Sequence, residues 1–150
     1  MSLDTFLSVL LVYRHNFQVL HWMAHGESFL TIHEQAKNYY DSLSDDIDVV
    51  AEMILRNKDS IINYKEALDL VDEADHDFLL MTGKDLCDMS AFVEFSTKMF
   101  NDLKTCVEEV LDEDYIESDH SVGIKSVLEG MHDKYDLQAR YIVKRLTPIK

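Results

Sequence analysis

The sequence predicts an all-α protein, a four-helix bundle whose second and third long helices are joined by a long crossover carrying a short helix. Only four glycines and one proline occur in 150 residues, so little interrupts long helices. Apolar residues recur at intervals of three and four over four long stretches, which is the spacing of amphipathic helices. The length suits one domain with a single core, so we expect residues 1–150 to form one unit.

The first two helices are expected on either side of Gly26. The apolar periodicity of the first covers residues 3–25, and Gly26 is well placed to end it. The second helix is expected to begin between residues 28 and 31 and to end near residue 57. Thr31 followed by Glu34 fits a capping box at its start.

The crossover is expected to hold a short helix over residues 61–71, then an acidic loop and a turn at residues 82–84. The third long helix is predicted from Ser90, as its N-cap, to Leu111. After an acidic break at residues 112–117, the fourth is expected to start at residue 119 or 121 and to reach Leu146, just before Pro148. Four long helices with one long central connection have ferritin-like connectivity.

The negative net charge of the chain limits the kinds of ligand that we expect it to bind. Lys and Arg number 14 and Asp and Glu 29, so the formal net charge is −15. Phosphates are repelled by such a surface, so we expect no DNA binding, whereas cations are attracted. The basic residues near the C-terminus form a modest cluster that the helix dipole explains. They are Arg140, Lys144, Arg145 and Lys150.

The sequence also argues against two further classes of protein, those stabilised by disulfides or zinc and those that span a membrane or are secreted. Cys87 and Cys106 are isolated, which argues against a disulfide scaffold or a zinc ribbon and favours a reducing compartment. The apolar stretch at residues 6–13 is too short to span a membrane, and it lacks the flanks of a signal peptide. We therefore expect a cytoplasmic protein without a membrane partner.

The first two helices carry the best candidates for metal ligands. His21 ends the first helix and His33 opens the second. Asp48 and Glu52 are four residues apart and share one face of the second helix. They stand among apolar residues, so we expect this region to be partly buried, and a buried carboxylate pair needs a counter-charge or a metal. Nitrogen and oxygen donors suit ferrous iron, manganese or zinc. A solvated charged face is the alternative.

The spacing of these residues limits how they can act together. His33 and Asp48 are 15 residues apart on one rigid helix, or about 22 Å. One chain cannot bring both to one ion, but two antiparallel copies of the helix around a two-fold axis can. The usual site inside one bundle needs Glu-x-x-His on two helices. Glu129 and His132 fit that pattern, and Glu73 with His76 fits within the crossover, but the first helix holds no Glu. We expect Glu129 and His132 to form an ordinary surface pair.

The residues from His21 to Glu52 resemble the Dps family, the DNA-binding proteins from starved cells, or mini-ferritins. Five separated elements keep the family's register over about 32 residues, with spacings of 12, 15 and 4 between the four candidate ligands. The elements are His21-Trp22, Gly26 with Phe29 and Leu30, His33-Glu34, Tyr40-Asp41, and Asp48 with Ala51-Glu52.

This resemblance implies a hollow dodecamer that oxidises ferrous iron with hydrogen peroxide or dioxygen and stores the ferric product. It implies that His21 and His33 of one subunit and Asp48 and Glu52 of its partner hold the metal. It also implies that Trp22 lies beside the site, where it intercepts oxidising equivalents.

Lys37 departs from the family, which usually has Asp or Glu one turn after the second histidine. A charged ammonium cannot bind a metal. Lys37 could pair with Asp48 or Glu52 of the partner and leave one metal position instead of two, or it could turn to solvent. An iron-oxidising storage protein is therefore the leading hypothesis. The alternatives are a ferritin-like structural or metal-binding protein with an impaired oxidation site, and a helical module that acts through partner helices.

Overall fold

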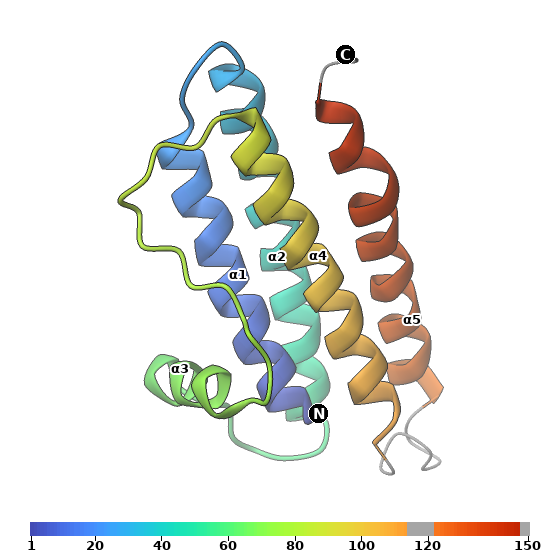
Figure 1. The fold of residues 1–150 in the computed structure, drawn as a ribbon. Coiled ribbons are helices and arrows are strands. Elements are labelled where there is room, and N and C mark those ends of the chain that lie inside the picture. Colours follow the sequence, from blue (N-terminus) through green and yellow to red (C-terminus); the bar gives the residue numbers. More distant parts are fainter. Residues whose placement is uncertain (114–121, 148–150) are drawn as a thin grey trace.

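The computed structural model describes residues 1–113 and 122–147. Four long helices run beside one another (Figure 1): α1 (Leu3–Met23), α2 (Phe29–Leu55), α4 (Met89–Leu111) and α5 (Val122–Leu137). α5 continues into a π-helical turn, η2 (Gln138–Ile142), and a 3-10 turn, η3 (Val143–Leu146). The crossover between α2 and α4 carries the short helix α3 (Tyr64–Glu73). The predicted all-α bundle with a long crossover is confirmed.

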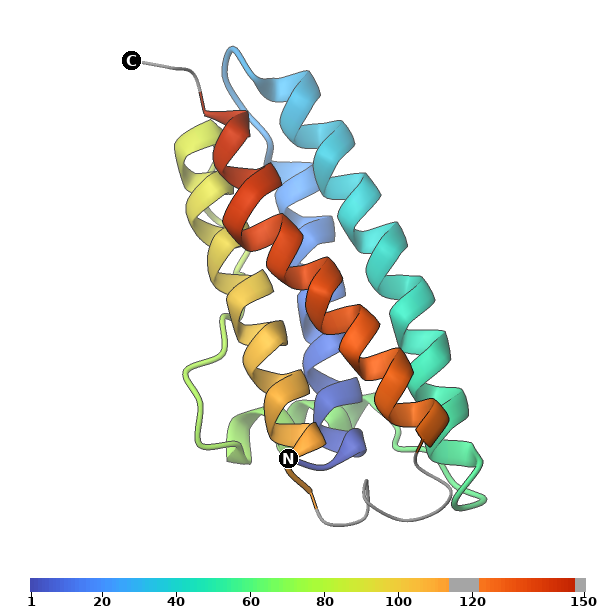
Figure 2. The same cartoon turned by 90° about the vertical axis from the view of Figure 1, so that its right-hand side faces the viewer.

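The helices form two antiparallel pairs. α1 packs along α2, and α4 packs along α5, so that the bundle has two layers. Figure 2 shows α3 lying across one end of the bundle, where it contacts α1. From there the chain climbs along α1 and enters α4 at the opposite end (Figure 1).

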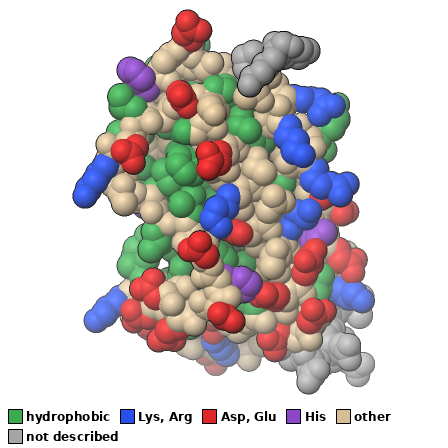
Figure 3. All heavy atoms as spheres, in the orientation of Figure 1, with side chains coloured by type: hydrophobic (Ala, Val, Ile, Leu, Met, Phe, Trp, Pro, Cys, Tyr) green, Lys and Arg blue, Asp and Glu red, His purple; other side chains and the backbone are tan. Residues whose placement is uncertain are grey.

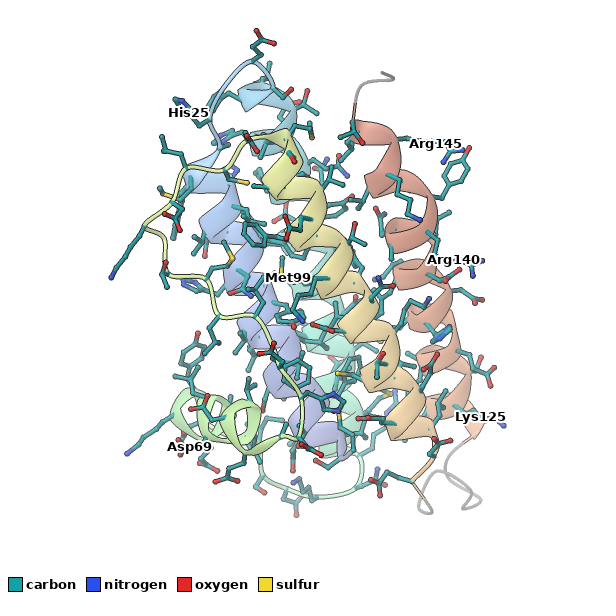
Figure 4. The ribbon with its side chains drawn as sticks, viewed as in Figure 1. His25, Asp69, Met99, Lys125, Arg140 and Arg145 are labelled. Carbon is teal, nitrogen blue, oxygen red and sulfur yellow. The ribbon has the colours of Figure 1, made fainter. Side chains whose placement is uncertain are left out.

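Aromatic rings from all four long helices meet in the core. The ring centroids of Phe17 and Tyr39 lie 5.1 Å apart, and Phe100 lies 5.3 Å from Phe17 and 4.8 Å from Tyr39. Tyr135 continues the cluster at 6.2 Å from Phe100. Met99, labelled in Figure 4, is fully buried between the helices. Each helix therefore contributes at least one large ring to a shared core, and such burial is the main stabilising force of the fold.

One buried carboxylate ties α2 to α5. Asp46 is 5% exposed, and its oxygens accept hydrogen bonds from the Lys134 ammonium at 2.5 and 2.7 Å and from the Tyr135 hydroxyl at 2.7 Å. Because both donors stand on α5, this contact fixes the rotation of α2 about its own axis. The acidic residues on either side of Asp46 consequently point away from the core.

The predicted capping box at the start of α2 is wrong. The helix begins at Phe29 with Ser28 as its N-cap, and Ser28 makes no side-chain capping bond. Thr31 and Glu34 therefore lie inside the first two turns. The earlier start is stabilised by the bond from the Ile32 amide to the Ser28 carbonyl, 3.0 Å long.

The predicted N-cap of α4 is also wrong. Asp88, rather than Ser90, caps the helix, and its carboxylate accepts from the Ala91 amide at 2.9 Å. The cause is tertiary, because the preceding Cys87 pairs with α1. Its amide donates to the Met23 carbonyl at 2.8 Å, and its carbonyl accepts from His25 at 2.9 Å.

The C-terminal helix is regular over a shorter range than predicted. It is α-helical to Leu137 and then widens to η2 before it tightens to η3 at Leu146. In η2, the side-chain oxygen of Gln138 accepts a bond of 2.7 Å from the hydroxyl of Tyr39. The predicted starts at residues 119 and 121, the acidic residues 114–117 and the stop at Pro148 lie outside the described residues.

The described surface is acidic near α3. Figure 3 shows acidic side chains gathered around that end of the bundle, and Glu66, Asp69, Asp72 and Glu73 stand there on exposed positions. Among the helices of residues 1–113 and 122–147, none is long and apolar enough to cross a membrane.

Candidate metal centre

His21 and His33 meet where α1 ends and α2 begins. Their ring centroids are 3.6 Å apart and the ring planes are 20° from parallel. The turn between the helices contains Gly26 with φ of 98°, a conformation open mainly to glycine. His25, which stands in this turn, points away from the bundle (Figure 4). The fold therefore brings His21 and His33 together and leaves the third nearby histidine outside.

Each of the two imidazoles forms a hydrogen bond with the backbone of the other histidine. Nδ1 of His21 donates to the carbonyl oxygen of His33 at 2.6 Å, and Nδ1 of His33 donates to the carbonyl oxygen of His21 at 2.9 Å. A carbonyl oxygen only accepts, so the proton of each neutral ring sits on Nδ1. The lone pair is then on Nε2 in both rings. This is the orientation that second-shell hydrogen bonds give to metal-binding histidines.

Two aromatic residues that the sequence reasoning did not name as site residues support this pair. Phe29 stacks on His33 with centroids 5.1 Å apart, and Tyr40 meets His21 edge to face at 5.5 Å. The sequence spacing could have indicated both residues. Phe29 is four residues before His33 and Tyr40 is seven after it, so the three side chains share one face of the helix. Both rings restrict the rotation of the imidazoles.

The stacked arrangement offers two coordination positions instead of one. A metal bound to Nε2 lies close to the plane of its ring at about 2.1 Å from the nitrogen. The ring centroids are 3.6 Å apart and the ring planes are only 20° from parallel, so the rings are stacked instead of being turned toward a common point. This geometry favours one coordination position on each ring over one ion shared by both.

Asp48 and Glu52 lie elsewhere on the same chain. Both side chains are exposed on α2, about four and five turns beyond His33, and His33 is separated from Asp48 by about 22 Å along the helix. The region around them is partly buried, as expected, since Val50 is buried and Val49 is half-buried. The buried carboxylate of this segment is Asp46, and its counter-charge is Lys134. Within residues 1–113 and 122–147, no group of three or more His, Cys, Asp and Glu side chains could hold a metal.

Lys37 pairs within its own helix. Its ammonium donates to Asp41 at 2.8 Å, and both side chains are more than half exposed. This hydrogen bond raises the pKa of Lys37, so the residue stays charged at neutral pH. Lys37 and Arg14 also lie 5.8 and 6.0 Å from the centroid of the Tyr40 ring. The surroundings of the histidines within one subunit are thus partly cationic.

Trp22 follows His21 in the chain and points outward. It is 60% exposed and meets His15 edge to face at 6.3 Å. Its exposure leaves the indole open to contact with another molecule.

The histidines of the two Glu-x-x-His motifs form hydrogen bonds with glutamates of α4. His132 contacts Glu108 at 2.9 Å, and His76 contacts Glu109 at 2.9 Å. The prediction that His132 pairs with Glu129 is therefore wrong, because the neighbouring helix supplies a closer partner. Both histidines have a structural role between elements.

Solved structures of Dps proteins are similar to this chain over nearly its whole length. The Dps of Staphylococcus aureus aligns with a TM-score of 0.81 at 17% identity, covering 99% of this chain and 93% of that one. The Dps of Listeria monocytogenes aligns with 0.76 at 19% identity, covering 97% and 92%. The Vibrio cholerae Dps, described as a member of a broad superfamily of ferritin-like diiron-carboxylate proteins, aligns with 0.74 at 18% identity, covering 96% and 83%.

No family model and no curated protein matches the sequence. At identities below 20%, the structural likeness establishes the fold alone. The chain has the ferritin-like four-helix fold of Dps proteins.

Proposed function

We propose that this protein oxidises ferrous iron at a site shared between two subunits and stores the ferric product within a hollow oligomer. The observation that carries the proposal is the histidine pair, in which both Nδ1 atoms donate to carbonyl oxygens and both Nε2 atoms keep their lone pairs. The Dps-like fold supports it. Iron is the substrate and cargo of this protein.

In this proposal, His21 and His33 each provide one nitrogen, and the partner's Asp48 and Glu52 provide oxygens. Borderline divalent cations such as ferrous iron accept this mixture of donors. Two anionic carboxylates offset the charge of the bound ions and stabilise the ferric product. Two ferrous ions each lose one electron, and one hydrogen peroxide with two protons takes both electrons and becomes two waters. Dioxygen is the other oxidant we consider.

The remaining properties follow the same proposal. Acidic surfaces attract ferrous ions to the assembly, as expected for a chain of net charge −15. We propose a dodecamer, a cytoplasmic location and no role in DNA binding. Trp22, next to His21 and exposed, is proposed to intercept oxidising equivalents that escape the site.

Anaerobic titration with ferrous iron, followed by addition of peroxide, tests the proposal. We expect oxidation that is faster than that of free iron and that saturates at a fixed ratio of iron to subunit. His33→Ala should lose this phase while the oligomer persists. His132→Ala is the matched control, because this histidine pairs with Glu108 on another part of the surface and its loss should leave oxidation unchanged. Oxidation at the rate of free iron in the unmodified protein would overturn the proposal.

Lys37 supports a second candidate function, a ferritin-like protein that binds a divalent ion for assembly without efficient oxidation. Its charged ammonium stands one turn from His33, where it repels a second cation. Stable binding of ferrous iron without acceleration by peroxide or dioxygen would favour this candidate.

A further inference from the structure

Tyr135 and Asp46 form a buried hydrogen-bonded pair that the proposed iron site does not use. The hydroxyl of Tyr135 donates to a carboxylate oxygen of Asp46 at 2.7 Å, a short bond of the kind that an ionised acceptor makes. Burial, together with the nearby carboxylate, raises the pKa of Tyr135 well above its ordinary value, so the phenol is protonated at neutral pH. The ammonium of Lys134 provides the counter-charge of the carboxylate. The pair therefore joins a neutral phenol to an anionic base inside the bundle.

This pairing makes one-electron oxidation of the phenol feasible. A phenol that loses an electron becomes a strong acid, and it must pass its proton to a base at the same moment. Asp46 already accepts the hydrogen bond of Tyr135, so the proton has only to cross that bond. Once protonated, the carboxyl group can donate a hydrogen bond back to the phenoxyl oxygen. Tyr135 can thus give up an electron without any rearrangement of the surrounding chain.

Aromatic side chains lead from the histidine pair to Tyr135. Tyr40 meets His21 edge to face at 5.5 Å, and Tyr39 is the neighbour of Tyr40 in the chain. The ring centroid of Tyr39 lies 4.8 Å from that of Phe100, which lies 6.2 Å from that of Tyr135. Electron transfer is efficient over steps this short between aromatic rings. We call this series the aromatic path, and it connects the buried phenol to the candidate iron site.

We propose that Tyr135, with Asp46 as its base, donates one electron to the oxidation reaction at the histidine pair. The inference rests on the proposed function. Hydrogen peroxide takes two electrons, and two bound ferrous ions supply both. The ammonium of Lys37 opposes a second cation beside His33, however, so a subunit often holds one ferrous ion, which supplies one electron. Tyr135 then supplies the other.

Electrons and protons balance in this step. One ferrous ion loses an electron and becomes ferric. Tyr135 loses an electron and passes its proton to Asp46, which leaves a neutral phenoxyl radical and a neutral carboxylic acid. Hydrogen peroxide takes the two electrons and two protons from solvent, and its oxygen–oxygen bond breaks to give two waters. No hydroxyl radical is released. A later ferrous ion reduces the phenoxyl radical, and the proton returns from Asp46.

Two other buried tyrosines lack part of this arrangement. The hydroxyl of Tyr39 donates to the side-chain amide oxygen of Gln138 at 2.7 Å, and an amide is not a base at neutral pH. Tyr13 donates to the carboxylate of Asp102, but its ring contacts Phe78 of the crossover, which is not part of the aromatic path. The radical is therefore expected at the end of the aromatic path, where a carboxylate accepts the proton.

Electron paramagnetic resonance tests this assignment in samples frozen after peroxide is added to protein with one ferrous ion per subunit. We expect a tyrosyl signal. Tyr135→Phe keeps the ring and removes the hydroxyl, so it should lower the signal at least tenfold and release hydroxyl radicals that a spin trap detects. Asp46→Asn keeps an acceptor oxygen without a base and should lower the signal equally, with urea unfolding to show that both variants fold. Tyr141→Phe, at an exposed tyrosine of η2, is the matched control and should leave the signal unchanged. A signal that survives Tyr135→Phe, or a tryptophan signal in its place, would overturn the proposal.

A second experiment uses no iron and so separates this inference from the proposed function. A ruthenium photo-oxidant is attached to Glu27→Cys, in the exposed turn between α1 and α2, and labelling is selective because Cys87 and Cys106 are buried. After a light flash, the phenoxyl radical should persist at least tenfold longer than in the same labelled protein with Tyr135→Phe. Equal lifetimes would overturn the inference even where iron is oxidised. A radical that depends on Tyr135 would support it even where the proposed iron oxidation fails.

Discussion

Replacement of Asp46 should show most clearly how α2 is fixed against α5. Its carboxylate accepts from Lys134 and Tyr135, and both Asp46 and Tyr135 are buried. Asp46→Ala removes both bonds at once. We expect it to destabilise the bundle and to loosen the rotation of α2, which orients the exposed Asp48 and Glu52.

The expected loss in the free energy of unfolding follows from the hydrogen bond that each donor, Tyr135 or Lys134, can no longer make in Asp46→Ala. The Tyr135 hydroxyl is fully buried, and an unpaired buried hydroxyl costs about 1–3 kcal/mol. The Lys134 side chain is 38% exposed, so its ammonium can return to water and adds little. We therefore expect a loss of about 2 kcal/mol in the free energy of unfolding, or about 4–8 °C in Tm for a chain of this size.

Urea unfolding followed by circular dichroism, at one fixed subunit concentration, measures this loss. Asp133→Ala, a change at an exposed aspartate on α5, should stay within about 0.5 kcal/mol of the unmodified protein. Adding Tyr135→Phe to Asp46→Ala should recover about 1 kcal/mol, because it removes the unpaired hydroxyl. The reasoning is refuted if Asp46→Ala matches the control, or if the second change recovers nothing.

Three further predictions concern the turn, pH and metal binding. Gly26→Ala should cost about 1 kcal/mol in urea unfolding through strain alone, because φ is 98° and no atom lies within 4 Å of the added Cβ. Burial raises the pKa of Tyr39 to about 12, so its contribution to stability is complete below pH 10 and is lost as pH rises from 10 through 12. Tyr39→Phe should flatten that alkaline decline in unfolding experiments at several pH values, and an unchanged decline would contradict the assignment. Lys37→Met should tighten ferrous binding in anaerobic titration about tenfold, because it removes a cation beside His33; equal or weaker affinity would show that the ammonium does not oppose the metal.

The arrangement of helices was predictable because it depends on local patterns. Apolar spacing located the four long helices, and the long stretch between the second and third required a crossover. The residues at which the helices begin and end were harder to predict from the sequence. Asp88 caps α4 because Cys87 pairs with the end of α1, and that contact joins residues more than sixty positions apart.

The candidate site was predictable in part. His21 and His33 were named from their positions at facing helix ends, and the structure stacks their rings. The reciprocal Nδ1 hydrogen bonds and the supporting ring of Phe29 depend on the geometry of the turn, which residue spacing alone does not describe. The partly buried region around Asp48 was predictable, but the spacing did not show which of its acids turns inward, because Asp46 and Asp48 both stand among apolar residues.

Apolar spacing alone located the long helices, and residue numbers alone gave the separation of His33 from Asp48, since a rigid helix rises by a fixed distance per residue. That separation requires a second chain for any site that uses both residues. Which acid turns inward, and which imidazole nitrogen keeps its lone pair, were settled by tertiary contacts. Those outcomes depend on partners distant in the chain, such as Lys134 for Asp46, and it is packing of one helix against another that selects them.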